Sequence, residues 1–378
     1  MPARSAPARS APARRPQVFV AGDLHNLGDL KLTLQNLALT QGRGGAVRRW
    51  AGLPEAIERQ VEEAGGTLVP GKQIVAFARR VWGAELVLGG GQIVRDNVSA
   101  ASLAGLALAA LAAVLGGGTV TTRGLGVSVI RSPLRRFLWR AVLRRCAIVN
   151  VRDDISKLNL AALLPGKAVA VTADMVFFPT VSPLAGDDPG EEEGAGDEAG
   201  DRRRWVVVAP CDDAGEGRVL DTALLDAMIA AALAALPGAR LAIACHDPRE
   251  SMDRAAAARI AARWSASAPR IVDSFELAVL TRLYRQAGLV LTNRLHSLIF
   301  AVIAGAPVLG IGDGTSKVRV VAGEFAIPVA QPGEAAQAAD LVAQALGFDA
   351  EARTARRHDM ASRATRNLIA PPAPPRRA

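Results

Sequence analysis

An arginine and a histidine, Arg294 and His296, stand two positions apart where an apolar run gives way to a new helix. The run Leu289–Leu291 ends just before them, the helix-length apolar segment Ser297–Ala304 follows, and a strand restarts at Pro307–Ile311. Arginine binds carboxylates and phosphates through its guanidinium fork, and histidine transfers protons near neutral pH. The two residues therefore predict an anion site beside one proton-transfer group.

The elements around this pair predict where it lies in the fold. A strand, a helix and a second strand in this order are typical of a βαβ unit, which places Arg294 and His296 at the carboxyl end of a strand, on the first helical turn. Open parallel sheets bind ligands at that edge, and helix N-termini attract anions. Two structural alternatives stand beside this interpretation. His296 lies at the edge of the apolar stripe and could cap the preceding loop, and Arg294 could pair with an acid of the linker.

Three further clusters follow strand-like runs in the first half of the chain. They contain His25, Asn26 and Asp29 after Gln17–Gly22, Gly89, Gly90 and Gly91 after Glu85–Leu88, and Arg152 and Asp153 after Ala147–Val151. None matches G-x-G-x-x-G or a Walker motif. Three glycines let a backbone approach a ligand closely, although a tight turn also uses glycine. A helix cap would explain Asp153 but leaves Arg152 unexplained.

Alternating strands and helices predict an α/β protein with two Rossmann-like doubly wound domains that face each other across a cleft. The first domain is expected over residues 17–178 and the second over 205–350. An acidic, Pro- and Gly-containing linker or insertion, 179–204, separates them. The basic ends, 1–16 and 351–378, are expected to be tails, with the Pro/Ala/Arg-rich residues 1–16 and 370–378 disordered.

The net charge of +9 arises entirely from the two ends of the chain. Basic and aromatic residues are not interleaved as in a nucleic-acid platform, so no nucleic-acid partner is expected. We expect the basic tails to have no binding role. The alternative is that they contact anionic lipid head groups, which would give peripheral membrane contact. The three cysteines, Cys146, Cys211 and Cys245, fit no disulfide framework, which favours a reducing, cytoplasmic compartment, with the inner face of the membrane as an alternative.

One uncharged segment, Val98–Leu115, reaches the lower length limit of a membrane span. It is nearly half alanine, and it lies between two Gly-Gly-Gly turns where a crossover helix belongs. We expect it to be a buried core helix, and we expect no transmembrane span.

Together, these motifs resemble the polysaccharide pyruvyl transferase family, whose members move a pyruvyl group from phosphoenolpyruvate onto sugar hydroxyls. The resemblance rests on Asn26-x-Gly28-Asp29, Gly89-Gly90-Gly91, Val151-Arg152-Asp153-x-x-Ser156, Ala173-Asp174, Arg294-Leu295-His296-Ser297-Leu298-Ile299-Phe300-Ala301, Gly305-x-Pro307-Val308 and Lys317-Val318. The chain departs from the family pattern at Arg123–Val127, where a Gly-Pro pair is usual, and at His25, where a small or aromatic residue is usual.

The resemblance implies a fold of glycosyltransferase GT-B type, phosphoenolpyruvate as co-substrate with no cofactor or metal, and a role in building exopolysaccharide or cell-surface polysaccharide. The acceptor is expected to be a saccharide or a lipid-linked oligosaccharide. Forming a ketal requires protonation of C3 of the donor and removal of protons from acceptor hydroxyls. The expected catalytic residues are His296 and Asp29; donor-binding residues are Arg294, Arg152, Lys317, Gly89, Gly90 and Gly91; acceptor-binding residues are His25, Asn26 and Asp174.

Two other functions fit the same architecture. A nucleotide-sugar glycosyltransferase would bind a nucleoside diphosphate in place of phosphoenolpyruvate. A saccharide-binding scaffold would keep the fold without turnover, because fold does not fix function. Lys317 fits a solvated surface as well as it fits a ligand, and His246 is a weaker candidate for either substrate.

Overall fold

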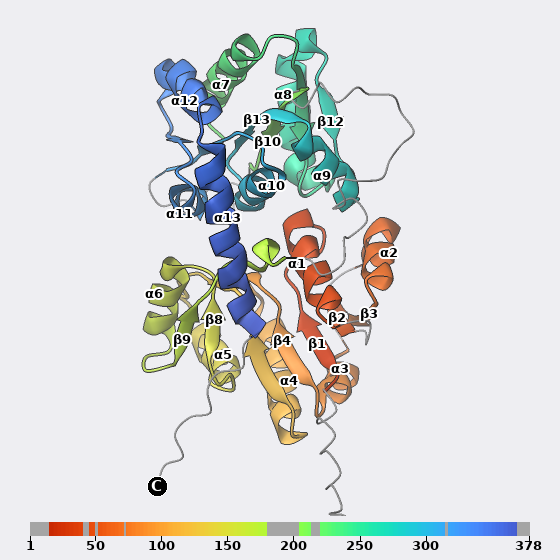
Figure 1. The fold of residues 1–378 in the computed structure, drawn as a ribbon. Helices are drawn as coiled ribbons and strands as arrows, with labels where there is room; N and C mark the ends of the chain where they lie inside the picture. The colour runs from red at the N-terminus through yellow and green to blue at the C-terminus, as the bar shows by residue number, and fades with distance from the viewer. Residues whose placement is uncertain are drawn as a thin grey trace, which may run out of the picture.

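The computed structural model describes residues 15–40, 45–49, 52–71, 73–179, 204–212, 220–313 and 317–368. Two α/β halves stack along the long axis of the molecule, and one long C-terminal helix runs alongside both of them (Figure 1). All pairings between named strands are parallel.

The N-terminal half contains two sheets. The larger sheet has the order β3-β2-β1-β4-β6, formed by β1 (Gln17–Val20), β2 (Gly45–Arg49), β3 (Gly66–Pro70), β4 (Glu85–Leu88) and β6 (Thr119–Thr122). The smaller has the order β5-β7-β8-β9, formed by β5 (Gly91–Val94), β7 (Leu125–Val127), β8 (Val149–Val151) and β9 (Val169–Val171). The helices are α1 (Leu27–Ala38), α2 (Glu55–Glu63), α3 (Ile74–Val81), α4 (Ala100–Leu115), α5 (Pro133–Leu143), α6 (Asp154–Leu163) and the 3-10 turn η1 (Met175–Phe177).

The C-terminal half is one sheet of order β12-β11-β10-β13-β14-β15. Its strands are β10 (Trp205–Ala209), β11 (Arg240–Ala244), β12 (Arg270–Val272), β13 (Ala287–Thr292), β14 (Val308–Ile311) and β15 (Val329–Ala330). Its helices are α7 (Thr222–Ala235), α8 (Ala255–Arg263), α9 (Leu277–Arg285), α10 (Leu295–Ala304), α11 (Lys317–Glu324), α12 (Ala338–Leu346) and α13 (Ala350–Thr365). The predicted α/β class with parallel sheets in separate domains is confirmed, with the refinement that the first half carries two sheets.

Three apolar clusters hold these layers together. One cluster packs α3, α4, α5 and α6 against one face of the N-terminal sheets, and another fills one face of the C-terminal sheet under α7, α8 and α12. The third is continuous from α1 and η1 of the N-terminal half to α9, α10 and α11 of the C-terminal half. The two halves are therefore joined by buried apolar surface, the dominant stabilising contribution in folded proteins.

The structure corrects the expected tail at residues 351–378. Residues 350–365 form α13, which leaves the C-terminal half and returns to the N-terminal half, where the buried Asn367 bonds to the Thr172 hydroxyl and the Ala173 carbonyl. Met360, Ala364 and the charged Arg353 are buried on this helix, while most of its other charged residues are exposed. The many charged residues of α13 hide its few apolar positions, so the sequence of this segment reads as a polar tail. The rest of the expected tails, 1–14 and 369–378, and nearly all of the expected linker lie outside the described residues.

The uncharged segment predicted as a core helix forms α4, and only its inner side is buried. Leu103, Leu106 and Ala110 lie in the core, whereas Leu108 and Leu115 are 54% and 65% exposed. No helix among the described residues has both the length and the apolar character that crossing a membrane requires.

Candidate active site

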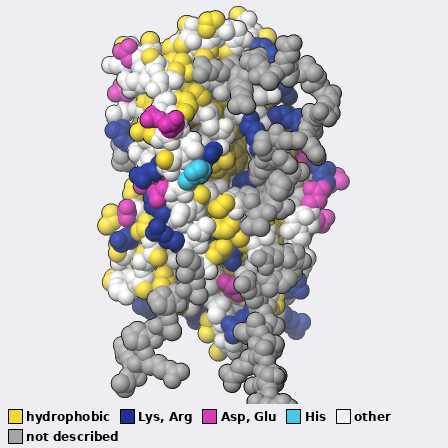
Figure 2. All heavy atoms as spheres, in the orientation of Figure 1, with side chains coloured by type: hydrophobic (Ala, Val, Ile, Leu, Met, Phe, Trp, Pro, Cys, Tyr) yellow, Lys and Arg dark blue, Asp and Glu magenta, His cyan; other side chains and the backbone are white. Residues whose placement is uncertain are grey.

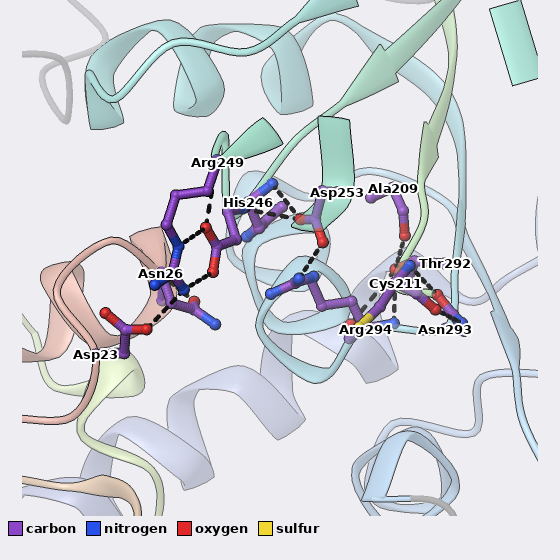
Figure 3. A network of polar contacts seen from close by, with 12 residues as sticks. Asp23, Asn26, Ala209, Cys211, His246, Arg249, Asp253, Thr292, Asn293 and Arg294 are labelled. Atoms are coloured by element: carbon purple, nitrogen blue, oxygen red, sulfur yellow. Dashed lines mark hydrogen bonds and ion pairs between the residues drawn. The ribbon is translucent and has the colours of Figure 1, made fainter. Parts of the chain in front are cut away.

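The turn that carries the Arg-Leu-His block is fixed to the neighbouring strand by side chains. Thr292, the last residue of β13, donates its hydroxyl to the Ala209 carbonyl at the end of β10. The Asn293 amide accepts from the Cys211 N–H at 2.7 Å and donates to the Cys211 carbonyl at 2.6 Å (Figure 3). These bonds hold the backbone where β13 becomes α10, so Arg294 leaves the strand end in one direction.

Arg294 is buried, and a buried carboxylate orients it. Its Nη2 donates to Oδ1 of Asp253, while Oδ2 of Asp253 accepts the N–H groups of His246 and Asp247 at 2.9 and 2.8 Å (Figure 3). The Arg294 Nε has no hydrogen-bond partner among the described residues. A buried donor without a partner costs free energy that an anionic ligand would recover. The acids of the linker, the alternative partners considered for Arg294, lie outside the described residues.

His296 lies in the first turn of α10 and faces the other half of the protein. Its side chain contacts the start of α1 so closely that a Cβ on Gly28 would come within 2.0 Å of Nδ1. The residue is 9% exposed, and its Nε2 has no hydrogen-bond partner in the described part of the chain. Burial, with contributions from Arg152, Arg294 and Lys317, lowers the pKa of His296 to about 4. The imidazole is therefore neutral in the empty protein at neutral pH.

Arg152 approaches His296 from the end of β8 in the N-terminal half, within electrostatic reach of the imidazole. It donates to Oδ2 of Asp174 at 3.0 Å, to Asp153 at 3.2 Å and to Oε1 of Gln92 at 2.9 Å. Asp153 also caps α6 by accepting the Ser156 N–H, as the structural alternative for this acid predicted. Three side chains from three segments thus hold one buried guanidinium in place.

Asp174, expected beside the acceptor, lies on the Arg152 side instead. Its Oδ2 accepts from Arg152, and its Oδ1 accepts the Val176 N–H at the start of η1. The residue is 4% exposed. Both carboxylate oxygens are therefore used inside the protein, and the position suits an anchor for Arg152 more than a contact with a sugar.

Asp29 is the carboxyl group of α1. Its Oδ2 accepts the Asp23 N–H at 3.0 Å, and a Cβ on Gly91 would come within 2.8 Å of its Oδ1. Burial raises the pKa of Asp29 to about 6, opposed by the Asp23 N–H and by the charges of Arg95 and Arg152. A carboxyl group with this pKa can take up a proton near neutral pH, which is what general-base work requires.

The remaining predicted residues occupy different places around this centre. Gly89, Gly90 and Gly91 connect β4 to β5, where Gly90 and Gly91 have φ values of 89° and 72°, and the Gly89 carbonyl accepts from the buried Asn36. Asn26 caps α1 through the Gly28 N–H, so its side-chain oxygen serves the helix. Lys317 begins α11 and lies within electrostatic reach of His296, with an exposed side chain.

A separate pocket of about 280 Å³ opens beside the β1–α1 loop. Its walls are mostly apolar, with Leu24, Ile93 and Leu106 on them, and His25 lies at the same site. The half-buried Arg95 also lines it, and its guanidinium makes no hydrogen bond or ion pair with any described residue. The pocket and the His296 centre share the β1–α1 segment, which carries His25 and Asp29.

The two halves are linked across the site by charged and polar contacts. Arg249 of the C-terminal half reaches Asp23 of the N-terminal half at 2.6 Å and also pairs with Asp247 of its own half (Figure 3). The Leu27 N–H donates to the His246 carbonyl at 2.8 Å. These contacts fix the start of α1, and with it Gly28 and Asp29, against the C-terminal half.

His246 is placed behind the site, within the protein. It is fully buried, and its Nε2 lies 2.7 Å from the Tyr284 hydroxyl, which lies 2.5 Å from Ser297 Oγ on α10. Burial, with the charge of Arg294, holds the pKa of His246 well below its usual value. This buried chain of polar side chains supports α10 from behind, and His246 does not line the pocket beside the β1–α1 loop.

Sequence reasoning missed several residues that build the site. Asp253, Tyr284, Gln92 and Arg249 belong to it through hydrogen bonds that span 13 to 226 positions of the chain, and Arg95 belongs to it as part of the pocket wall. Local motifs carry no signal for such contacts. One hint was available for Arg249 and Asp253, which follow the strand-end triplet Cys245-His246-Asp247.

Comparison with solved structures identifies the architecture. An S. aureus MnaA–UDP co-structure superposes with a TM-score of 0.59 at 12% identity, covering 94% of this chain and 95% of that one. UDP-GlcNAc 2-epimerase from Neisseria meningitidis, bound to UDP-GlcNAc, gives 0.57 at 12% identity, with 93% and 98% covered. Anabaena Alr3699/HepE in complex with UDP gives 0.56 at 13% identity, with 93% and 98% covered. At these identities the likeness shows the fold alone, and the fold is GT-B.

The family follows from the sequence. The model of the polysaccharide pyruvyl transferase family matches residues 74–314, more than half of the chain. The chain therefore belongs to this family, as the motifs predicted. No curated protein matches the sequence.

Proposed function

We propose that this protein is a phosphoenolpyruvate-dependent pyruvyltransferase that forms a pyruvyl ketal on saccharide hydroxyls during the synthesis of exopolysaccharide or cell-surface polysaccharide. The observation that carries the proposal is His296, a buried imidazole between the two halves within electrostatic reach of the buried Arg294 and Arg152. Family membership supports the transfer of a pyruvyl group. Phosphoenolpyruvate has two anionic groups, and two guanidinium forks suit them.

In the proposed reaction C3 of phosphoenolpyruvate gains a proton and C2 becomes electron-poor. One acceptor hydroxyl adds to C2, the bond from C2 to the phosphate oxygen breaks, and the second hydroxyl adds in its place. Two hydroxyl protons are released; one replaces the proton given to C3 and the other leaves on phosphate. Phosphoenolpyruvate acts as a co-substrate in this scheme.

His296 is assigned as the acid and Asp29 as the base. With a pKa of about 4 the imidazole is neutral before the donor binds, so it cannot act as the expected neutral-pH acid in the empty protein. A bound polyanion favours the imidazolium, because an opposite charge nearby raises a histidine pKa. Donor binding is therefore coupled to the uptake of one proton from solvent by His296. Asp29, with a pKa of about 6, is mostly ionised at neutral pH and accepts a hydroxyl proton.

The acceptor is assigned to the side of the β1–α1 loop. His25 and Arg95 line the pocket there, and Asp29 lies in the first turn of α1, which follows this loop. The Arg95 guanidinium, without a hydrogen bond or ion pair to any described residue, suits an acceptor that carries a carboxylate or phosphate. A lipid-linked oligosaccharide and an acidic sugar both have such a group.

Two measurements test the proposed function. The protein is incubated with phosphoenolpyruvate and candidate acceptors, and we expect released phosphate together with a product heavier by one pyruvyl ketal. In parallel, thermal shifts compare phosphoenolpyruvate with UDP, since a ligand that binds the folded state raises the melting temperature. Stabilisation by UDP alone would instead support a nucleotide-sugar glycosyltransferase. Saccharide binding without phosphate release from any acceptor would support the scaffold.

A further inference from the structure

Three neighbouring helices of the N-terminal half expose large apolar side chains on the side that faces away from the sheets. We call this the α3–α5 surface; its apolar members are Ile74, Val75, Trp82, Leu108, Leu111, Val114, Leu115, Leu134 and Phe137. Trp82, Leu115 and Phe137 are each more than 60% exposed. Single exposed apolar residues are ordinary, but nine on adjacent helices are not.

Contacts place these side chains on one continuous layer. A Cβ on Gly116, at the end of α4, would come within 2.9 Å of the Trp82 ring, and one on Gly105 would lie 3.7 Å from Ile74. The helix α3 thus runs along α4, and α5 packs against the other side of α4. The inner sides of all three helices enter the same core cluster, so their outer sides point away from it together.

The helix α4 gives the layer its unusual character. It has no charged or amide side chain along 16 residues, so it is apolar around its whole circumference. Helices of this kind are normally buried in protein or in lipid. Here only the inner side is buried, which leaves the outer stripe of Leu108, Leu111 and Leu115 facing solvent.

The charged residues of the three helices and their flanking turns are all arginines, one of which, Arg135, pairs with Asp96 outside them. Residues 74–82, 98–118 and 128–148 contain no Asp or Glu, and they contain the arginines Arg79, Arg80, Arg131, Arg135, Arg136, Arg140, Arg144 and Arg145. By contrast, the face shown in Figure 2 carries both basic and acidic side chains. A second copy of this surface would bring arginines against arginines, so self-association is opposed by like charge.

We propose that the α3–α5 surface docks the protein on an anionic lipid bilayer. The apolar side chains enter the boundary between head groups and acyl chains, as the apolar face of an interfacial helix does. Tryptophan is enriched at that depth, which suits Trp82. The flanking arginines contact anionic head groups. The occupant is a lipid surface, and the docking involves no membrane-spanning element.

The first test uses full-length protein and sedimentation with vesicles of equal parts phosphatidylcholine and phosphatidylglycerol. Wild type should bind these vesicles and bind pure phosphatidylcholine much less. Phe137→Glu should weaken binding at least about tenfold, because it removes buried apolar area and adds a repelled charge. Leu158→Glu, at an equally exposed leucine on α6 outside the surface, is the matched control and should bind as wild type. Circular dichroism and melting temperature check that both variants fold.

A second measurement does not depend on a disruptive substitution. Vesicles that contain brominated lipid should quench tryptophan emission of the wild type, and Trp82→Phe should remove most of that quenching while vesicle binding persists. Equal vesicle binding by Phe137→Glu and wild type would overturn the proposal and leave the basic ends as the lipid-binding parts. The proposal would also be overturned if the wild type does not bind vesicles but forms a dimer that Phe137→Glu converts to a monomer. That result would mean that the α3–α5 surface binds a second copy of the chain.

Discussion

At the scale of single residues, His296 is the group on which the proposed chemistry depends. It is the imidazole placed between the two halves, beside both buried arginines. His296→Ala should lower the rate of phosphate release by about a hundredfold to ten-thousandfold, the usual effect of removing a general acid. The matched control is His358→Ala, an exposed histidine on α13, which should keep wild-type turnover. Full activity of folded His296→Ala would remove the assignment of the acid.

The shifted pKa values also make stability depend on pH, with two opposing signs. Burial depresses the pKa of His296 to about 4 and also lowers that of His246, so the unfolded chain takes up protons first as pH falls below 6.5. Stability is therefore lost on acidification, at most about 1.4 kcal/mol per pH unit for each histidine. Asp29 acts oppositely, because burial raises its pKa from 3.8 to about 6. Its contribution to the free energy of unfolding is present at low pH and is lost as pH rises from 3.8 to about 6.

Denaturant unfolding at about pH 7 and pH 5 measures this balance. We expect the wild type to be less stable at the lower pH. His296→Gln should flatten the pH dependence and Asp29→Asn should steepen it, so the slopes are compared rather than the absolute stabilities. Identical slopes for all three proteins would show that neither group has the shifted pKa on which its catalytic role rests.

At the scale of elements, the start of α1 and the start of α10 meet at a position that only glycine fits. A Cβ on Gly28 would lie 2.0 Å from His296 Nδ1, too close without displacing the ring. Gly28→Ala should cost about 1–3 kcal/mol of stability and reduce turnover about as strongly as loss of the acid. Gly323→Ala on α11 is the control, because a Cβ there meets no atom within 4 Å; it should keep turnover. Wild-type turnover in Gly28→Ala would mean that the ring position is unimportant.

The elements also show what local sequence can and cannot predict. The strand expected at Glu85–Leu88 has its predicted bounds, and the strand expected at Pro307–Ile311 begins one residue later, because short apolar runs between breakers are a local signal. The segment from β2 to β3 carries no such signal. In β2, the charged Arg48 is almost fully buried and lies 4.9 Å from the Phe77 ring, so the strand does not read as apolar.

The residues of the candidate site also fall into two groups, those that local sequence predicts and those that only the folded chain brings together. Arg294 and His296 were found because they stand beside a strand end and a helix start, which are features of neighbouring residues. The partner of Arg294, Asp253, lies 41 positions earlier in an irregular turn, and only the folded chain brings them together. The pKa of His296 was expected near neutrality and is about 4, because the burial that lowers it comes from the other half of the molecule.

At the scale of the whole molecule, α13 ties the two halves together and ends beside the donor site. The Asn367 side chain accepts from the Gly124 N–H at 2.6 Å and from Thr172 Oγ1 at 2.8 Å, and it donates to the Ala173 carbonyl at 3.2 Å. Ala173 precedes Asp174, the carboxylate that holds Arg152. Asn367, just after α13, therefore supports the segment that holds Arg152, the guanidinium that we assign to phosphoenolpyruvate.

Asn367→Ala should consequently affect both stability and donor binding. It leaves the buried Gly124 N–H without its partner, which costs about 1–3 kcal/mol, and it loosens the segment that carries Asp174. We expect a lower melting temperature and a several-fold weaker stabilisation by phosphoenolpyruvate. Leu368→Ala, at the neighbouring exposed position, should change neither quantity. A lower melting temperature with unchanged donor affinity would limit α13 to a structural tie between the halves, with no influence on the Arg152 side of the site.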